Sequence, residues 1–411
     1  MPLDKPEAPR RLVRERKLAV IETADAAPCL RIMSEEGMLR AMDTHAFDVI
    51  IIGAGIAGAT AAAHLAADRR VVVIEAEEAP GYHSTGRSSA LWILNYGPPD
   101  VRILTGLSRP FLEAPPAGFA ETPILSPRAV VHLAPPDQEA DLDALLAGSV
   151  GMRAASLAEL RSLVPALKPD YAARGAIEED CFSIDVAALH QGYLRQMRAA
   201  GGVLALRNRA ERISRKGGNW EVATGGGATF AAPILVNAAG AWGDEVAKLA
   251  GVAPIGLQPK RRTIAVIESK PWQVAGWPAV NDVGHSWYCL PGSVRQLLVC
   301  PADETDMHPH DVQPEDLDIA IAIDRMQQAL DIEVRRIERS WAGLRSFTPD
   351  RRLAIGRDGA AEGFFWNVGQ GGFGIQSSKG AGKLLADLVN ERDPGPASGI
   401  VAKVDPRRFA S

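Results

Sequence analysis

The segment Phe47-Asp-Val-Ile-Ile-Ile-Gly-Ala-Gly-Ile-Ala-Gly58 decides the expected fold class. Its first six residues are a short, β-branched run with the length of a buried parallel strand. An Ala-rich stretch with helical character follows to Ala66, and residues 71–75 read as a second buried strand. Strand, glycine-rich turn, helix and strand in this order form the βαβ unit of a Rossmann-like dinucleotide-binding domain.

The glycines of this segment stand where a dinucleotide requires them. Gly53 permits the tight turn, Gly55 lets the backbone approach the pyrophosphate, and Gly58 lets the helix pack against the strand. The amino end of the helix then stabilises the phosphate charge. Glu75, 22 residues after Gly53, occupies the place of a carboxylate that accepts hydrogen bonds from ribose hydroxyls. With all these parts present, the motif is a strong signal for a dinucleotide.

Three later segments favour a cofactor longer than NAD. Residues 84–89 (STGRSS) bring small hydroxyls, a glycine and an arginine, which suit a diphosphate and a ribityl chain. Residues 236–242 (VNAAGAW) end an expected strand in side chains too small to obstruct a ligand. Residues 363–376 predict a strand, a glycine-rich loop and a helix that continues to Asn390, whose amino end would stabilise the negative charge of a reduced flavin. Together they predict FAD.

Length and composition narrow the class of protein. The 411 residues predict two domains, and 46% apolar residues with a net charge of −5 are ordinary for a soluble protein. No basic excess points to nucleic acid, no stretch reads as a transmembrane segment, and four scattered cysteines without CxxC spacing argue against a metal site or a disulfide framework. We therefore expect a cytoplasmic protein, and we expect residues 1–44 to be a disordered or non-native extension.

Several short sequence motifs resemble those of a known family. They are GYHSTGRSSA (81–90), PPAGF (115–119), LHQGYLR (189–195), LVNAAGAW (235–242), GLQPKRR (256–262), DVQPEDLDIA (311–320), WAGLRSF (341–347) and GQGGFGIQ (369–376). Through them the chain resembles the D-amino-acid oxidase superfamily of FAD-dependent oxidoreductases, and within it bacterial FAD-dependent D-arginine dehydrogenase.

The resemblance implies an α/β fold with two interleaved domains. A Rossmann-like, glutathione-reductase-like FAD domain is expected from residues 45–128, 180–256 and 344–411. An α+β substrate domain with an antiparallel sheet is expected from residues 129–179 and 257–343. Sequence and resemblance together predict these cofactor contacts: Gly53, Gly55, Ala57, Gly58, Glu75, Ala76, Ser84, Thr85, Gly86, Arg87, Ser88, Ser89, Ala210, Ala239, Gly240, Gly372, Phe373, Gly374 and Ile375.

The activity that the resemblance implies is oxidation of a D-amino acid to an imino acid, which then hydrolyses to a 2-oxo acid. Hydride transfer to flavin N5 requires orientation of the Cα–H bond more than a strong side-chain base. The resemblance places Arg262 and Arg345 on the substrate carboxylate, where guanidinium groups are well-matched donors. It places Tyr96 and Tyr288 at the same end of the substrate, and it gives the carbonyl of Gly372 to the amine.

The residues that would select arginine are missing. Where the family has an acidic residue this chain has Val130, and Leu91 and Leu290 replace a histidine and a lysine. Two further pocket positions correspond to Ala279 and Asn281. Burying a guanidinium without a counter-charge costs several kcal/mol, so we expect a preference for neutral, largely apolar D-amino acids. His285 and Asn281 are candidates to contact a polar side chain, although a lone histidine commonly serves the structure.

Two alternatives to this function stay open. One is an oxidase of glycine, N-methyl amino acids or cyclic imino acids, because the two arginines suit those substrates equally. The other is a flavoprotein without amino-acid chemistry. FAD is expected to bind non-covalently, since no cysteine stands in a recognisable attachment site. The electron acceptor is expected to be oxygen, a quinone or another oxidant.

Overall fold

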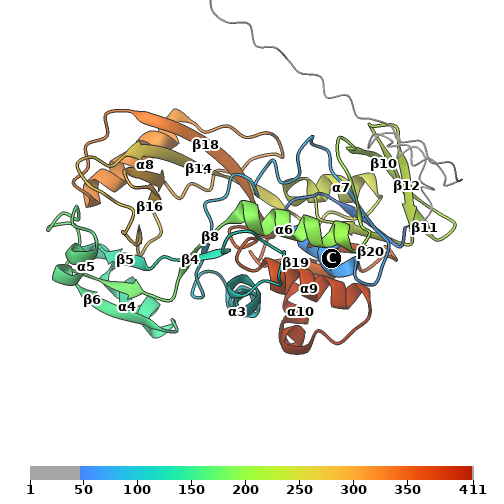
Figure 1. Cartoon of the computed structure of the whole chain (residues 1–411), viewed down its shortest axis with the longest axis horizontal. Coiled ribbons are helices and arrows are strands. Elements are labelled where there is room, and N and C mark those ends of the chain that lie inside the picture. Colours follow the sequence, from blue (N-terminus) through green and yellow to red (C-terminus); the bar gives the residue numbers. More distant parts are fainter. Residues whose placement is uncertain (1–46, 410–411) are drawn as a thin grey trace, which may run out of the picture. The chain divides into compact units, whose positions relative to one another are not determined.

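The computed structural model describes residues 47–409, so the expected extension at residues 1–44 lies outside the described residues (Figure 1). The first of its sheets has six strands in the order β19-β20-β13-β1-β2-β9. All neighbouring strands are parallel except β19, which runs antiparallel to β20. The strands are β1 (Val49–Ile52), β2 (Val71–Ile74), β9 (Val203–Ala205), β13 (Ile234–Asn237), β19 (Ala354–Arg357) and β20 (Phe364–Val368).

The central strands of this sheet are apolar throughout because helices cover them. Every residue of β1 and β2 is buried. Helix α2 (Ile56–Leu65) is also buried almost all round, and it packs against α6 (Val186–Ala199) and α9 (Ser378–Val389). Small alanines allow this close approach of three helices. The six-stranded sheet thus confirms the α/β class and the strand–turn–helix reading of residues 47–75.

The second sheet has eight strands in the order β18-β14-β17-β16-β15-β5-β7-β6. It is antiparallel except where β15 and β5 run parallel. Figure 1 shows its longest pair, β14 and β18, beside α8. The strands are β5 (Val130–Ala134), β6 (Met152–Ser156), β7 (Arg174–Glu178), β14 (Gln258–Glu268), β15 (Ala279–Asp282), β16 (Tyr288–Ser293), β17 (Gln296–Cys300) and β18 (Ile337–Phe347).

Two small sheets complete the strands of the described part. One joins β10 (Ala210–Lys216), β11 (Asn219–Thr224) and β12 (Thr229–Ala232). The other joins β3 (Leu91–Trp92), β8 (Phe182–Ile184) and β4 (Leu125–Pro127). In the sequence, β3 and β4 come before β5 of the eight-stranded sheet, and β8 follows β7 of that sheet.

The remaining helices pack against the sheets or against other helices. α3 packs against α9, and α8 packs against β14 and β17. No helix in residues 47–409 has both the length and the apolar character needed to cross a membrane. These helices are α3 (Pro99–Glu113), α4 (Glu139–Ala147), α5 (Leu157–Leu163), α7 (Gly243–Leu249), α8 (Asp316–Ala329) and α10 (Val401–Val404).

Candidate active site

The glycine-rich turn after β1 has the geometry that the sequence predicted. Gly53 has a φ of +102°, which strains any side-chain-bearing residue. A Cβ at Gly58 would lie 1.8 Å from the carbonyl oxygen of Gly53, so only glycine lets α2 begin this close to the turn. At the start of α2, the backbone N–H of Ile56 donates to Thr85 Oγ1 at 2.9 Å. Glu75 Oε2 accepts from the N–H of Ala54 at 2.8 Å, which fixes the carboxylate beside the turn.

A cavity of about 210 Å³ lies at this turn. Trp242 forms part of its wall, and its ring lies 4.6 Å from that of His83. Of the predicted cofactor contacts, this cavity is lined by Gly53, Gly55, Ala57, Glu75, Ala76, Ser84, Thr85, Ala210, Ala239 and Gly240. Gly58 and Gly86 line neither this cavity nor the larger one described next, and their lack of a side chain serves packing: a Cβ at Gly86 would lie 2.7 Å from the carbonyl oxygen of Gly81.

A second, larger cavity of about 620 Å³ adjoins the first. Their walls share Ile56, Ser84, Thr85, Leu344, Gln370 and Gly371. Two connected spaces, one at a helix amino end and one at a glycine-rich loop, suit an elongated dinucleotide such as FAD. The predicted contacts Arg87, Ser88, Ser89, Gly372, Phe373, Gly374 and Ile375 line the larger cavity.

Arg87 contacts protein rather than open space. Its Nη1 donates to the carbonyl oxygens of Val312 at 2.9 Å and Ala342 at 3.0 Å, and its guanidinium pairs with Asp311. Ser84 Oγ donates to the carbonyl oxygen of Leu344 at 2.6 Å. The loop at residues 84–89 is therefore tied to β18, which holds the cofactor segment against the eight-stranded sheet.

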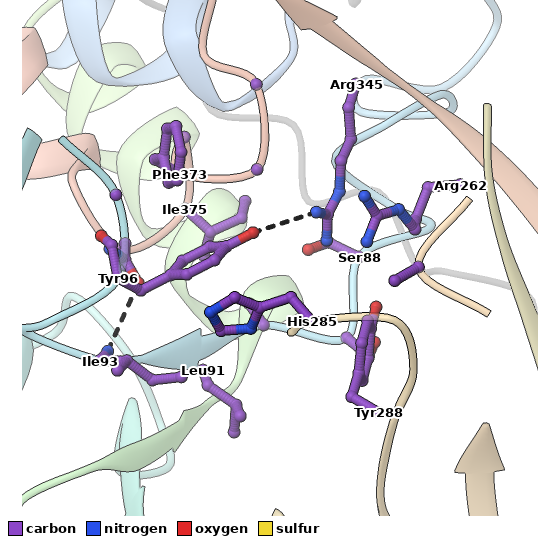
Figure 2. A pocket seen from close by; sticks show the side chains of 18 of the residues that line it. Ser88, Leu91, Ile93, Tyr96, Arg262, His285, Tyr288, Arg345, Phe373 and Ile375 are labelled. Carbon is purple, nitrogen blue, oxygen red and sulfur yellow. Dashed lines mark hydrogen bonds between the residues drawn. The ribbon is translucent and has the colours of Figure 1, made fainter. Parts of the chain in front are cut away.

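The register of β14 and β18 explains why two distant arginines meet. Arg262 lies directly opposite Gly343, and Arg345 is two residues further along β18. Side chains two residues apart on a strand share a face, so the two guanidinium groups project from the same side of the sheet. Both line the larger cavity, and Figure 2 shows them next to each other. Arg261, one residue earlier, projects to the other face and pairs with Asp318 at 2.8 Å.

The two arginines differ in their partners. Arg262 Nη2 lies 3.3 Å from Glu304 Oε1, and Glu304 also forms a two-pronged pair with Arg351. Arg345 has no salt bridge with any carboxylate of residues 47–409, and its guanidinium donates only to the Tyr96 hydroxyl at 3.2 Å (Figure 2). Burial alone would lower the pKa of Arg345, but its neighbours Tyr96 and Tyr288 hold that pKa above the ordinary value. A charged guanidinium without an anionic partner therefore faces the cavity.

The other predicted catalytic residues surround Arg345. A Cβ at Gly372 would lie 2.9 Å from both Arg345 Nη1 and the Tyr96 hydroxyl, so glycine lets the loop backbone approach them. Tyr288 lines the same cavity, and burial raises the pKa of its hydroxyl. The structure thus brings together all five residues predicted to be catalytic from separate parts of the sequence.

The predicted side-chain pocket also lies in this cavity. Leu91, Val130, Ala279, Asn281 and Leu290 all line it. Val130 and Ala279 are directly opposite each other on β5 and β15, and the side chains of both are buried.

His285 projects into the cavity rather than into the core, as Figure 2 shows. It has a φ of +53°, which is uncommon for a residue with a side chain. Asp282 holds the surrounding loop, because its carboxylate accepts from the N–H of Ser286 at 2.7 Å and of Trp287 at 3.2 Å. Burial lowers the pKa of His285, and His132 lowers it further, so the imidazole is neutral near pH 7.

Sequence reasoning did not identify several polar residues of this cavity. Asn95, His132, Glu178 and Glu304 all line it. Glu178 is the last residue of β7 and is 2% exposed. Its sequence context, a short apolar run followed by three acidic residues, resembles the solvent-exposed end of a strand. Only the pairing of β7 with β5 reveals that its side chain lies inside.

The family comparison decides the class of protein. The model of the family described as DAO, FAD-dependent oxidoreductase, matches residues 48–388. The chain belongs to this family. The resemblance deduced from the sequence and the requirement for FAD are thereby confirmed.

Individual relatives are more distant. The hydrogen cyanide synthase subunit HcnC of Pseudomonas aeruginosa is 28% identical over 236 residues, which are 57% of this chain and 55% of that protein. The chain therefore matches about half the length of this curated relative. A glycine oxidase structure from Geobacillus kaustophilus has a TM-score of 0.77 at 21% identity and covers 89% of this chain and 99% of its own. An L-proline dehydrogenase structure from P. horikoshii has a TM-score of 0.76 at 19% identity, with coverages of 89% and 98%. At these identities the two structures establish the shared fold.

Proposed function

We propose that this flavoprotein oxidises the Cα–N bond of a D-amino acid with a neutral side chain. The observation that carries the proposal is Arg345, a charged guanidinium that faces a cavity beside the loop at residues 369–376 and has no anionic partner within residues 47–409. A buried charge without a partner is costly, and an α-carboxylate would supply that partner with two hydrogen bonds. Arg345 thus favours an amino acid over a simple amine.

The remaining residues orient the substrate around that ion pair. Tyr96 is already hydrogen bonded to Arg345, and we assign it and Tyr288 to the carboxylate end. Arg262 contributes a second positive charge, reduced by Glu304. The carbonyl of Gly372 is assigned to the substrate amine. When the carboxylate and the amine are both held, the Cα–H bond can point in only one direction. This orientation lowers the activation barrier for hydride transfer.

The chemistry that bound FAD would supply is acceptance of the hydride from Cα, while the substrate amine would lose a proton as the C=N bond forms. The resulting imino acid hydrolyses to a 2-oxo acid and ammonia. The described residues fit the cofactor: Gly53 and Gly58 leave no space for a side chain, and the helix that follows the turn starts beside the smaller cavity. We propose non-covalent binding, with oxygen, a quinone or another oxidant as the final acceptor.

Apolar residues line the part of the cavity assigned to the substrate side chain. Leu91, Val130 and Leu290 are in its wall and carry no charge, and Glu178, the carboxylate opposite Val130, lies next to His132. An oxidase of glycine or of cyclic imino acids is the second candidate, because the named functions of the two similar structures include a glycine oxidase and an L-proline dehydrogenase.

Anaerobic bleaching of the purified yellow protein tests the proposal. Each member of a panel of D- and L-amino acids, glycine, sarcosine and proline is added in the absence of oxygen, and flavin absorbance is followed. The proposal expects rapid bleaching by at least one neutral D-amino acid and slower bleaching by its L-enantiomer. Bleaching by glycine or proline alone would replace it with the second candidate. A flavin that no amine on the panel reduces would remove amino-acid chemistry altogether.

A further inference from the structure

Two residues that line the larger cavity have neighbouring side-chain atoms without a hydrogen bond in the described part of the chain. These atoms belong to Glu178 and His132, and neither residue is used in the chemistry proposed above. We infer that this pair recognises a neutral side-chain group of the substrate that both donates and accepts a hydrogen bond, such as a carboxamide or a hydroxyl. The inference rests on the proposed function, whose anchor is Arg345 at another part of the same cavity.

Strand register places the pair beside the apolar side-chain pocket. Val130 on β5 lies opposite Glu178 on β7 and opposite Ala279 on β15. His132 is two residues after Val130 and lies opposite Asn281. Residues directly opposite on paired strands share a face, as do residues two apart on one strand. These five side chains therefore form one continuous surface, with Glu178, Val130 and Ala279 in one row and His132 and Asn281 in the next.

The Glu178 carboxylate is only half satisfied. Its Oε1 accepts a hydrogen bond from Asn95 Nδ2 at 2.8 Å, whereas Oε2 has no partner among residues 47–409. The nearest candidate, His132 Nε2, is 3.8 Å away, which is beyond hydrogen-bonding distance. That nitrogen also lacks a partner in the described structure. Buried polar atoms are normally hydrogen bonded, so two adjacent unpaired atoms on residues that line a cavity favour a ligand group that bonds to both of them.

Asn281 determines which atom of His132 carries the proton. Its Nδ2 donates to the carbonyl oxygen of Asp282 at 2.8 Å, which identifies that atom as the amide nitrogen. The same nitrogen lies 3.2 Å from His132 Nδ1. Nδ1 must then accept, and the ring proton resides on Nε2. The pair therefore offers an N–H donor at His132 and an oxygen acceptor at Glu178.

This combination selects the type of group that can bind. An ammonium or guanidinium would be attracted by Glu178, but it would face the N–H of His132 with another donor. A carboxylate would accept from His132 and be repelled by Glu178. A carboxamide or hydroxyl satisfies both atoms. A purely apolar group leaves both atoms unpaired, which disfavours its binding.

Pairs of substrates with the same shape test this inference on the wild-type enzyme. Asparagine is compared with leucine, and threonine with valine, in whichever configuration reduces the flavin. We expect kcat/KM to be at least tenfold higher for the polar member of at least one pair. Higher kcat/KM for leucine and valine than for their polar counterparts would overturn the inference, as would a preference for lysine or arginine. In the first case, reduction by leucine would leave the proposed function intact; a preference for lysine or arginine would also overturn its neutral side chain, while the carboxylate anchor at Arg345 would still stand.

A pair of matched variants assigns the effect to the site. E178Q keeps the shape of Glu178 and its acceptor for Asn95, but it turns a donor toward His132. E179Q makes the same change one residue later, on a side chain that is 68% exposed and pairs with Arg153. We expect the polar-to-apolar ratio of kcat/KM to fall at least tenfold in E178Q and to stay within twofold in E179Q. An unchanged ratio in E178Q would overturn the assignment, and loss of folding in E178Q would leave the wild-type substrate pairs as the deciding measurement.

Discussion

Replacing Arg345 by methionine tests the most exposed claim about the cavity, namely that an unpaired guanidinium anchors the substrate. Removing one member of a buried, hydrogen-bonded charge pair costs about 2–5 kcal/mol. At about 1.36 kcal/mol for each factor of ten, kcat/KM should fall by roughly 30-fold to 5,000-fold on any active amino acid. Arg262 already shares Glu304 with Arg351, so Arg262→Met should cost less.

Flavin content and a matched variant separate anchoring from folding. Both variants should retain FAD near the wild-type ratio of flavin to protein absorbance, because neither residue is a predicted contact of the cofactor. Arg339→Met makes the same change on the exposed part of β18 and should leave kcat/KM within twofold. Steady-state rates on the best substrate provide the comparison. Wild-type kcat/KM in Arg345→Met would refute carboxylate anchoring, and a larger loss in Arg262→Met would reverse the roles of the two arginines.

Three further changes test other parts of the structure. Gly58→Ala brings a Cβ within 1.8 Å of a carbonyl oxygen of the turn, so the purified protein should lose most of its FAD, whereas Gly399→Ala, with no atom near its Cβ, should keep it. Burial lowers the pKa of His64 to about 3, so the unfolded chain binds a proton more readily than the folded one as pH falls below about 6.5. Between pH 6.5 and 5, the free energy of unfolding of the wild type should therefore fall by up to about 2 kcal/mol more than that of His64→Gln, measured by urea titration. Val130→Glu places a second carboxylate opposite Glu178, so the ratio of kcat/KM for D-arginine to that for D-leucine should rise at least tenfold, and an unchanged ratio would show that residue 130 does not contact the side chain.

The local signals in the sequence predicted the cofactor domain well because its physical requirements are contiguous. The turn, the helix start and the second strand all fall within residues 47–75. At Gly53 and Gly58, neighbouring backbone atoms lie too close to leave space for a side chain. The order of strands in the six-stranded sheet adds segments from much later in the chain. The small residues of these segments predicted contact with the cofactor. No local sequence pattern, however, specifies which strands pair with each other.

The side-chain pocket was less predictable because its composition depends on strand register. Val130 and Leu290 were identified by position in a resemblance, and both lie in the cavity. Glu178 is 48 positions from Val130, and nothing in the sequence around it indicates a buried carboxylate. Pairing of β5 with β7 puts the two side chains next to each other. A shift of one residue in that pairing would have turned Glu178 to the other face.

Charge balance within the cavity connects these observations. Glu304 pairs with both Arg262 and Arg351, and its single negative charge offsets only one of them. Among residues 47–409, Arg345 has no carboxylate partner and Glu178 Oε2 has no hydrogen bond. They carry opposite charges but have different surroundings, because Tyr96 stands beside the guanidinium and the N–H of His132 beside the carboxylate. An α-carboxylate satisfies the first, and a neutral group with both a donor and an acceptor satisfies the second. The same residues that disfavour an arginine side chain thus leave room for a polar one, and one substrate can meet both ends only if its side chain is uncharged.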